Sequence, residues 1–276
     1  MNLIVQGTAL ADGDLRRLAQ LAGTQRIERL GSSACRLVGA QRQPDIAEYC
    51  ERAGLDFGFV PEGRRLADMR LLAIDMDSTL ITIECIDEVA DLAGVKAEVA
   101  AITAAAMAGE LDYAQSLRRR VGLLQGLDEA ALARVYEDRL RLSPGAETLL
   151  AAVRSAGMKT LLVSGGFSFF TERLKSRLGL DYSISNALEI EHGRLSGRVV
   201  GNIVDAQAKA ARLRALRDEF GIARDAVIAI GDGANDLAMM AEAGVSIAYR
   251  AKPVARSKAD YALDHCGLDG ALNLFA

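Results

Sequence analysis

The sequence of 276 residues predicts an α/β protein built on a doubly wound parallel sheet, with a helical cap insert and a small α+β domain at its N-terminus. Three observations lead to this prediction. After residue 143, apolar strands alternate with helices, which is typical of a parallel sheet covered on both faces. Residues 86–142 consist almost entirely of helix formers. Before residue 69, shorter apolar runs alternate with helical stretches.

Residues 1–68 are the predicted small α+β domain. The runs NLIVQG, ACRLVGA and DFGFVP are expected to be strands, and helices are expected over Asp12–Ala22 and Pro44–Gly54. This order of elements resembles an amino-acid-binding regulatory domain of the ACT type. A packing or dimerisation module is an equal alternative, so a homodimer is one expectation for the assembly.

The predicted α/β core comprises residues 69–85 and 143–276, with the cap of residues 86–142 between its two parts. LLAIDMD opens the core as a buried strand, and the strands TLLVSGG, AVIAIGDG and GVSIAY follow after Ser143-Pro144-Gly145. Helices are expected between them, over Glu147–Ala156, Phe169–Leu178 and the run AMMAEAG.

The composition excludes several classes of partner. The formal net charge is −4 and the isoelectric point is about 5.4, so a concentrated basic face for nucleic acid is not expected. Apolar runs are all shorter than the roughly 18 residues that a membrane span needs, and the N-terminus does not have the pattern of an export signal. The four cysteines have no metal-site or disulfide-framework spacing, which predicts reduced thiols and a cytoplasmic protein.

Polar motifs follow three of the predicted strands. DMDST follows LLAI, SGG follows TLLV, and GDGAND follows AVIAI. Because ligands bind outside the carboxyl ends of parallel strands, we expect these motifs to form one active site. Oxygen ligands without nearby His or Cys select a hard ion such as Mg²⁺, and Asp75, Asp77 and Asp232 are its expected ligands, with Asp236 in support.

The same crevice has groups suited to a phosphate. Backbone amides of Ser164-Gly165-Gly166, with the Ser164 hydroxyl, are expected to bind phosphate oxygens at a helix N-terminus. A lysine or arginine should complete the site, but pattern alone does not choose Lys209 over Arg212 or Arg214. An aspartate beside the metal can act as a nucleophile on phosphorus, and an acid two residues later can protonate the leaving oxygen and then activate water.

The motifs DMDST, VSGG, a downstream lysine and GDGAND, in this order, resemble the haloacid dehalogenase superfamily of aspartate-nucleophile phosphotransferases. The resemblance extends from Leu71 to the C-terminus and implies a Mg²⁺-dependent enzyme. It implies that Asp75 is the nucleophile and a metal ligand, and that Asp77 is the general acid/base and binds the metal through its backbone carbonyl. Asp232 is implied as the second carboxylate ligand.

ECIDE, GELDYAQSLRRRV and VSGGF narrow the resemblance to the phosphoserine phosphatases, which catalyse the last step of serine biosynthesis. The resemblance implies that Glu84 faces the ammonium group of O-phosphoserine and that Arg120 faces its carboxylate. From the residues alone, Arg120 cannot be chosen from Arg118–Arg120. Met107 and Tyr113 are candidates for the apolar wall of the cap. The resemblance also implies that Ser164, Gly165 and Lys209 bind the phosphoryl group and that Asn235 helps to place it.

Two alternatives remain open at this point. A related enzyme could transfer the phosphoryl group to another acceptor, such as homoserine, or hydrolyse a different small phosphomonoester. A signalling domain phosphorylated on Asp75 is a non-enzymatic alternative, but Asp77 argues against it because a poised acid/base would shorten the life of the phosphorylated state.

Overall fold

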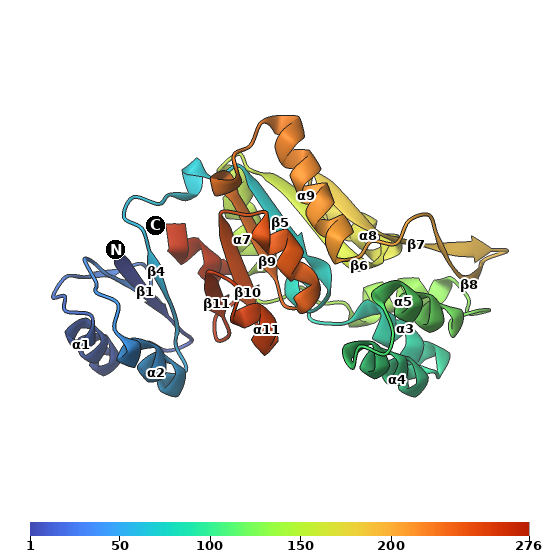
Figure 1. Ribbon diagram of the computed structural model, residues 1–276, viewed down its shortest axis with the longest axis horizontal. Helices are drawn as coiled ribbons and strands as arrows, with labels where there is room; N and C mark the ends of the chain where they lie inside the picture. The colour runs from blue at the N-terminus through green and yellow to red at the C-terminus, as the bar shows by residue number, and fades with distance from the viewer. Residues whose placement is uncertain (276) are drawn as a thin grey trace.

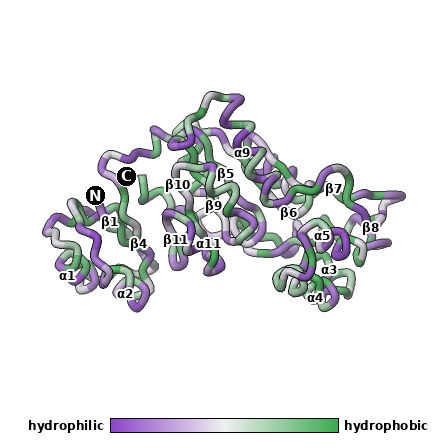
Figure 2. The backbone as a smooth tube through the Cα atoms, in the orientation of Figure 1, coloured by the Kyte–Doolittle hydropathy of each residue, from purple (hydrophilic) through white to green (hydrophobic). Residues whose placement is uncertain are grey.

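The computed structural model describes residues 1–275 and contains two β-sheets. Figure 1 shows the small N-terminal sheet at one end of the molecule, the large sheet in the middle and the helical cap at the other end. Apolar residues gather along strands such as β4 (Asp56–Val60), whereas connecting loops are mainly hydrophilic (Figure 2).

The N-terminal sheet is antiparallel and has the order β2-β3-β1-β4. Its predicted strands and both predicted helices are present, and the helices bury Leu18 and Ile46 against one face. The short strand β2 was not predicted, because its three residues lie at the exposed edge and lack an apolar pattern. The elements besides β4 are β1 (Asn2–Gln6), α1 (Asp12–Leu21), β2 (Ile27–Arg29), β3 (Ala34–Leu37) and α2 (Pro44–Ala53).

The large sheet has the strand order β11-β10-β9-β5-β6-β7-β8. Strands β5 to β7 and β9 to β11 are parallel, which confirms the predicted fold class. The strands are β5 (Leu71–Asp75), β6 (Lys159–Phe167), β7 (Tyr182–Glu191), β8 (Arg194–Val200), β9 (Val227–Gly231), β10 (Val245–Tyr249) and β11 (Tyr261–Leu263).

The β7–β8 hairpin of the large sheet was not predicted. Strand β8 pairs antiparallel with β7 at the edge of the sheet. The two are joined by His192 and Gly193, which both have positive φ angles of 52° and 77°, as a two-residue hairpin turn requires. The sequence EHGR carries this turn signal, but the polar residues of both strands hid the strand pattern.

Helices cover both faces of the large sheet. On β5, Leu71 and Ala73 pack toward α9 and α10, whereas Leu72 and Ile74 pack with residues of α7 and α8 on the other face. This two-sided burial explains why LLAI is continuously apolar. The helices are α7 (Ala146–Ser155), α8 (Ser168–Leu178), α9 (Ala206–Phe220), α10 (Leu237–Ala241) and α11 (Pro253–Arg256).

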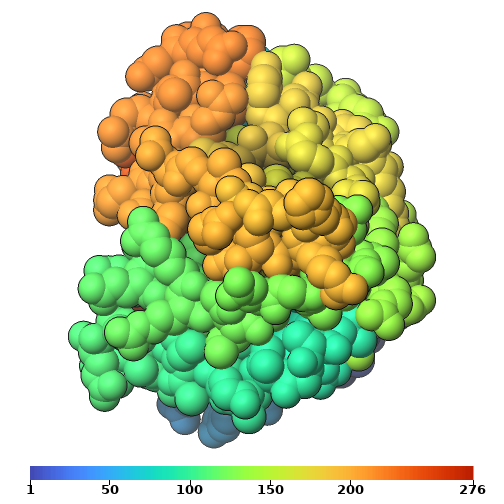
Figure 3. Space-filling view, turned by 90° about the vertical axis from the view of Figure 1, so that its right-hand side faces the viewer, coloured from blue at the N-terminus to red at the C-terminus, as the bar shows by residue number. Residues whose placement is uncertain are grey.

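The cap follows β5 and returns to the core through a bridge between Ile81 and Leu142. It also contacts the β7–β8 hairpin, since Gly126 N–H donates to the Leu195 carbonyl and Leu195 N–H donates to the Leu127 carbonyl, both at 2.8 Å. Figure 3 shows the hairpin lying against the cap. The cap helices are α3 (Cys85–Ala93), α4 (Lys96–Met107), α5 (Tyr113–Gly122) and α6 (Ala130–Arg134), which continues as a turn over Val135–Arg139.

The N-terminal sheet is fixed to the core through Asp56, the first residue of β4. Its buried carboxylate accepts backbone N–H groups from Asp264, His265 and Cys266 at 2.8–3.2 Å. Nearby, Gly58 has no room for a side chain, since an added Cβ would lie 2.6 Å from the Tyr261 ring. These contacts join the two sheets through residues about 200 positions apart in the chain.

Within residues 1–275, no helix has the length and apolar character needed to cross a membrane. In the same residues, Cys35, Cys50, Cys85 and Cys266 are free thiols, the first three of them buried. The cytoplasmic location stays a prediction.

Candidate active site

The three strands that carry the polar motifs are neighbours in the sheet, in the order β9-β5-β6. Their carboxyl ends therefore meet at one edge, as the sequence predicted. The ends open into a cavity of about 120 Å³ between core and cap. The charged and amide side chains that line it are Asp75, Asp77, Glu84, Arg120, Asp232, Asn235 and Lys252.

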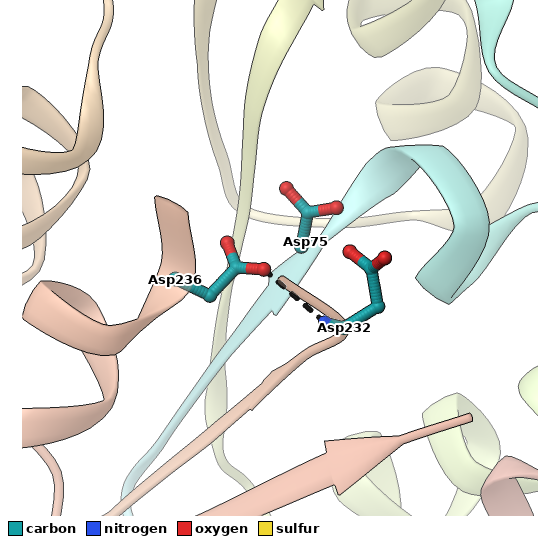
Figure 4. Close-up of side chains that lie close together, drawn as sticks. All are labelled: Asp75, Asp232 and Asp236. Atoms are coloured by element: carbon teal, nitrogen blue, oxygen red, sulfur yellow. Dashed lines mark hydrogen bonds between the residues drawn. The ribbon is translucent and has the colours of Figure 1, made fainter. Parts of the chain in front are cut away.

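A cluster of three carboxylates lies at this cavity, two of them (Asp75 and Asp232) in its wall. Asp75, Asp232 and Asp236 are buried, and one oxygen of each lies within 4.8 Å of the others (Figure 4). Burial, followed by the charge of Asp236, raises the pKa of Asp75 well above its ordinary value. Crowded oxygen ligands of this kind fit a hard cation, which would offset their repulsion. The cluster could therefore hold a metal ion.

Lys209 lies beside the cluster and is only 1% exposed. It belongs to the first turn of α9, whose N-cap residue Asp205 accepts the Ala208 N–H group at 2.9 Å. The Lys209 ammonium donates to Asp75 and, at 2.9 Å, to Asp236 Oδ1. Burial opposes the charge of Lys209, but the two aspartates outweigh it and raise its pKa. The structure thus distinguishes Lys209 from Arg214, which pairs with Glu242 at the surface.

Asp236 is held on both sides. Its Oδ1 accepts a hydrogen bond from the Lys209 ammonium. Its Oδ2 accepts the N–H groups of Asp232 at 3.2 Å and of Gly233 at 3.1 Å. An added Cβ on Gly231 would lie 2.5 Å from its carboxylate, so the GDG turn closes tightly around Asp236. Asp236 therefore fixes both the Asp232 backbone and the Lys209 ammonium.

Asp77 lies in the same cavity but outside the carboxylate cluster. Its Oδ1 accepts the N–H of Cys85, the first residue of cap helix α3, at 2.8 Å, and its Oδ2 accepts the Ser164 hydroxyl at 3.1 Å. Burial raises the pKa of Asp77 above its ordinary value, which suits a proton donor. Directly after Asp77 the chain turns, and Ser78 has a φ angle of 57°.

Glu84 and Arg120 line the cavity beside these groups. Glu84 accepts a hydrogen bond from the Ser78 hydroxyl at 2.7 Å. Desolvation by the surrounding protein, followed by the charge of Asp77, raises the pKa of Glu84 to about 7. Solvent still reaches part of its side chain. Arg120 is half-buried, and its Nε finds no hydrogen-bond partner within residues 1–275. Arg118 and Arg119 are exposed instead, so of the three consecutive arginines Arg120 alone lines the cavity.

The segment Ser164-Gly165-Gly166 differs from its expected position. It lies within the end of β6, where the pairing with β7 shifts register, and helix α8 begins only at Ser168. The segment is therefore extended backbone beside Asp77 and not the first turn of a helix. Ser164 is fully buried, and an added Cβ on Gly166 would lie 2.8 Å from Asp77 Oδ2.

Sequence reasoning missed Lys252. This residue follows β10, donates its backbone N–H to the Asp232 carbonyl at 2.8 Å and places its Nζ 3.9 Å from Asp232 Oδ2. Its position after a fourth parallel strand was a usable signal, since that strand end lies at the same edge of the sheet. Of the two proposed wall residues, Tyr113 lines the cavity, whereas Met107 is 75% exposed and does not line it.

Comparisons with known proteins agree with this geometry. The family model of haloacid dehalogenase-like hydrolases matches residues 72–241, and a model of a domain of unknown function matches residues 3–46. A phosphoserine phosphatase of Polaromonas sp. is 54% identical over 215 residues, which cover 76% of this chain and 91% of that protein.

Two solved structures match nearly the whole chain. A probable phosphoserine phosphatase of Vibrio cholerae, in unliganded form, has a TM-score of 0.88 and 38% identity, and the match covers 99% of this chain and 86% of that one. A haloacid dehalogenase family hydrolase of Salmonella enterica serovar Typhi has a TM-score of 0.89 and 34% identity over 100% and 99% of the two chains. The small sheet, core and cap are thus an arrangement shared with other proteins.

Proposed function

This chain belongs to the haloacid dehalogenase-like hydrolases, and on that premise we propose that it hydrolyses O-phospho-L-serine to L-serine and phosphate. The reaction would be the last step of serine biosynthesis. The observation that carries the proposal is the pairing of Glu84 and Arg120, two opposite charges, in one small cavity with Asp75. The similarity to the phosphoserine phosphatase of Polaromonas sp. supports the same substrate.

In this proposal Asp75 is the nucleophile. Its carboxylate attacks phosphorus, the bond to the serine oxygen breaks, and Asp77 protonates that oxygen as it leaves. Asp77 then accepts a proton from water, which attacks the aspartyl-phosphate and releases phosphate. The raised pKa of Asp77 and its contacts with Cys85 and Ser164 support this role.

The phosphoryl group is assigned to Ser164, Gly165, Lys209 and Asn235. Lys209 supplies a buried positive charge that is already bonded to Asp75. Asn235 lines the cavity next to the carboxylate cluster. Such preorganised donors stabilise charge on the phosphoryl oxygens more effectively than water does.

The metal ion is proposed to be Mg²⁺. The carboxylates of Asp75 and Asp232 and the backbone carbonyl of Asp77 would hold it, and when bound it would neutralise charge on the phosphoryl group. The crowding of Asp75, Asp232 and Asp236 supports a divalent cation at this place.

Selectivity is proposed to come from the ionic groups of the cavity wall. Glu84 would bind the substrate ammonium and Arg120 its carboxylate, which together distinguish phosphoserine from other phosphomonoesters. The unpartnered Nε of Arg120 supports this assignment within residues 1–275, since a buried guanidinium donor is costly to leave without an acceptor.

Phosphate release from L-phosphoserine, phosphoethanolamine, phosphothreonine and glycerol phosphate tests the proposal. We expect strong preference for L-phosphoserine, because only it offers the ammonium, the carboxylate and the smaller side chain together. A flat profile would contradict the proposed substrate. Adding homoserine and following the phosphorylated products distinguishes hydrolysis from transfer.

The division into a small domain at 1–68, a core at 69–85 and 143–276 and a cap at 86–142 is likewise a proposal. Residues 1–68 are proposed to be an ACT-like regulatory or dimerisation module. Their strand order β2-β3-β1-β4 supports this assignment. Sedimentation of the full chain with and without L-serine tests both roles.

A further inference from the structure

We propose that the hydroxyl of Tyr113 is a positioning group: when the cap is closed on the core, this hydroxyl helps to orient Asp77. The coupling runs through the peptide bond between Gly165 and Gly166 and through the Ser164 hydroxyl. This inference rests on the proposed function, in which Asp77 is the acid/base. It concerns the phenolic oxygen of Tyr113 and not the apolar wall that its ring provides.

The first link is a hydrogen bond from cap to core. Tyr113 is the first residue of α5, where Asp112 and Gln115 form a reciprocal cap that fixes the start of the helix. The Tyr113 hydroxyl donates to the Gly165 carbonyl at 2.8 Å. An added Cβ on Gly165 would lie 2.3 Å from this hydroxyl oxygen, so the glycine provides the space that the tyrosine enters.

The second link is the peptide group itself. The Gly165 carbonyl and the Gly166 N–H belong to one rigid plane, so fixing one fixes the direction of the other. Gly166 N–H donates to Ser164 Oγ at 2.8 Å. Because Ser164 Oγ accepts this bond, its own hydrogen is free to point at Asp77, to which it donates at 3.1 Å.

The third link returns to the cap. The other oxygen of Asp77 accepts the N–H of Cys85 at the start of α3. Helix α3 of the cap thus contacts Asp77 directly. Helix α5 of the cap contacts it indirectly, through Tyr113, the Gly165–Gly166 peptide and Ser164. If the cap moved away from the core, Asp77 would lose its direct bond from Cys85, and the indirect support would lose the Tyr113 donor.

Asn186 holds the Gly165 carbonyl from the core side, so the Gly165–Gly166 peptide keeps one support that does not depend on the cap. The Asn186 side chain is 1% exposed, donates to the same Gly165 carbonyl at 2.7 Å and accepts the Val204 N–H at 2.8 Å. Both partners lie outside the cap, so the carbonyl keeps one donor whatever the cap does. A carbonyl oxygen has two lone pairs, and Tyr113 supplies the second donor only when the cap is seated.

The test is Tyr113→Phe, which keeps the ring and removes the hydroxyl, with Tyr136→Phe elsewhere in the cap as the matched control. The substrates are L-phosphoserine, whose alkoxide must be protonated as it leaves, and 4-nitrophenyl phosphate, whose phenolate leaves without a proton. We measure kcat/KM, which covers the steps up to departure of the leaving group. For Tyr113→Phe we expect a loss of about 3- to 10-fold on L-phosphoserine and of less than about 2-fold on 4-nitrophenyl phosphate.

Each outcome decides the inference. A larger loss on L-phosphoserine than on 4-nitrophenyl phosphate supports it. Phenylalanine keeps the ring, so a wall role predicts no loss on either substrate, and a folding role lowers both equally. Equal losses on both substrates, or a loss below about 2-fold on L-phosphoserine, overturn it. If the wild-type chain does not hydrolyse L-phosphoserine, the proposed substrate fails; the inference is then tested with an alkyl phosphate that the enzyme does accept, set against 4-nitrophenyl phosphate.

Discussion

Two buried aspartates near strand ends show how differently the same residue type is used in this molecule. Asp56 begins β4 and is 4% exposed, and Asp75 ends β5 and is 3% exposed. Asp56 is surrounded by backbone N–H groups of residues 264–266, which donate to both its oxygens. Asp75 instead lies among other carboxylates and accepts a hydrogen bond from the Lys209 ammonium.

The difference distinguishes a structural carboxylate from a functional one. Neutral N–H donors stabilise the carboxylate of Asp56, so this region needs no bound cation to offset its charge. At the other site, three carboxylates face the buried Lys209, and Lys252 lies 3.9 Å from Asp232, so negative charge is in excess. Burial, followed by the charge of Asp236, raises the pKa of Asp75. An arrangement that is unfavourable by itself gains stability when a cation binds.

Asp75→Asn gives the largest expected effect. Removing the proposed nucleophile should lower kcat by about 10⁴-fold or more. Because the change also removes repulsion inside the carboxylate cluster, the thermal midpoint of unfolding should not fall. Activity assays and circular dichroism melting measure the two quantities, and substantial remaining turnover would show that Asp75 is not the nucleophile.

Arg120→Met should have the next largest effect. Loss of a charged hydrogen-bond donor to the substrate carboxylate should lower kcat/KM for L-phosphoserine by about 10- to 100-fold, and much less for glycerol phosphate. Arg119→Met, in the adjacent exposed position, is the matched control and should behave like the wild type. If the two variants lose activity equally, the carboxylate is bound elsewhere.

Asp56→Asn tests the other half of the comparison. The amide removes the charge and places an NH₂ group among the N–H donors of Asp264, His265 and Cys266, so the free energy of unfolding should fall by about 1–3 kcal/mol. Urea unfolding measures this loss, while kcat of the folded enzyme should stay within about 2-fold. A large loss of kcat at unchanged stability would mean that the contact of Asp56 with residues 264–266 affects catalysis.

The pH dependence of selectivity should show the smallest effect. The pKa of Glu84 is about 7, above the ordinary 4.5, so Glu84 loses its charge as the pH falls through about 7. The ratio of kcat/KM for L-phosphoserine to that for glycerol phosphate should therefore drop by up to about 10-fold from pH 8 to pH 6. Using the ratio cancels the titration of enzyme groups that act on both substrates alike. In Glu84→Gln the ratio should be low and flat, and a ratio that still falls would assign the titration to another group.

The strand ends and their polar motifs could be predicted because they follow from local pattern and sheet topology. LLAI, TLLV and AVIAI are recognisable as buried strands, and parallel strands bring their carboxyl ends to one edge whatever the details of packing. The sequence therefore predicts Asp75, Asp77 and Asp232 as site residues. The β7–β8 hairpin escaped because its strands are largely polar.

By itself, the sequence determined the fold class, the crevice at the ends of β5, β6 and β9 and the set of residue types gathered there. Only the tertiary structure decided which cation is buried against Asp75, which of three adjacent arginines lines the cavity, and that Asp56, Tyr113 and Lys252 make the contacts they do. Local patterns encode backbone conformation and burial. They do not encode the rotation of α9 or α5 about its axis, or which groups meet across 50 to 200 residues, because these depend on how the helices pack.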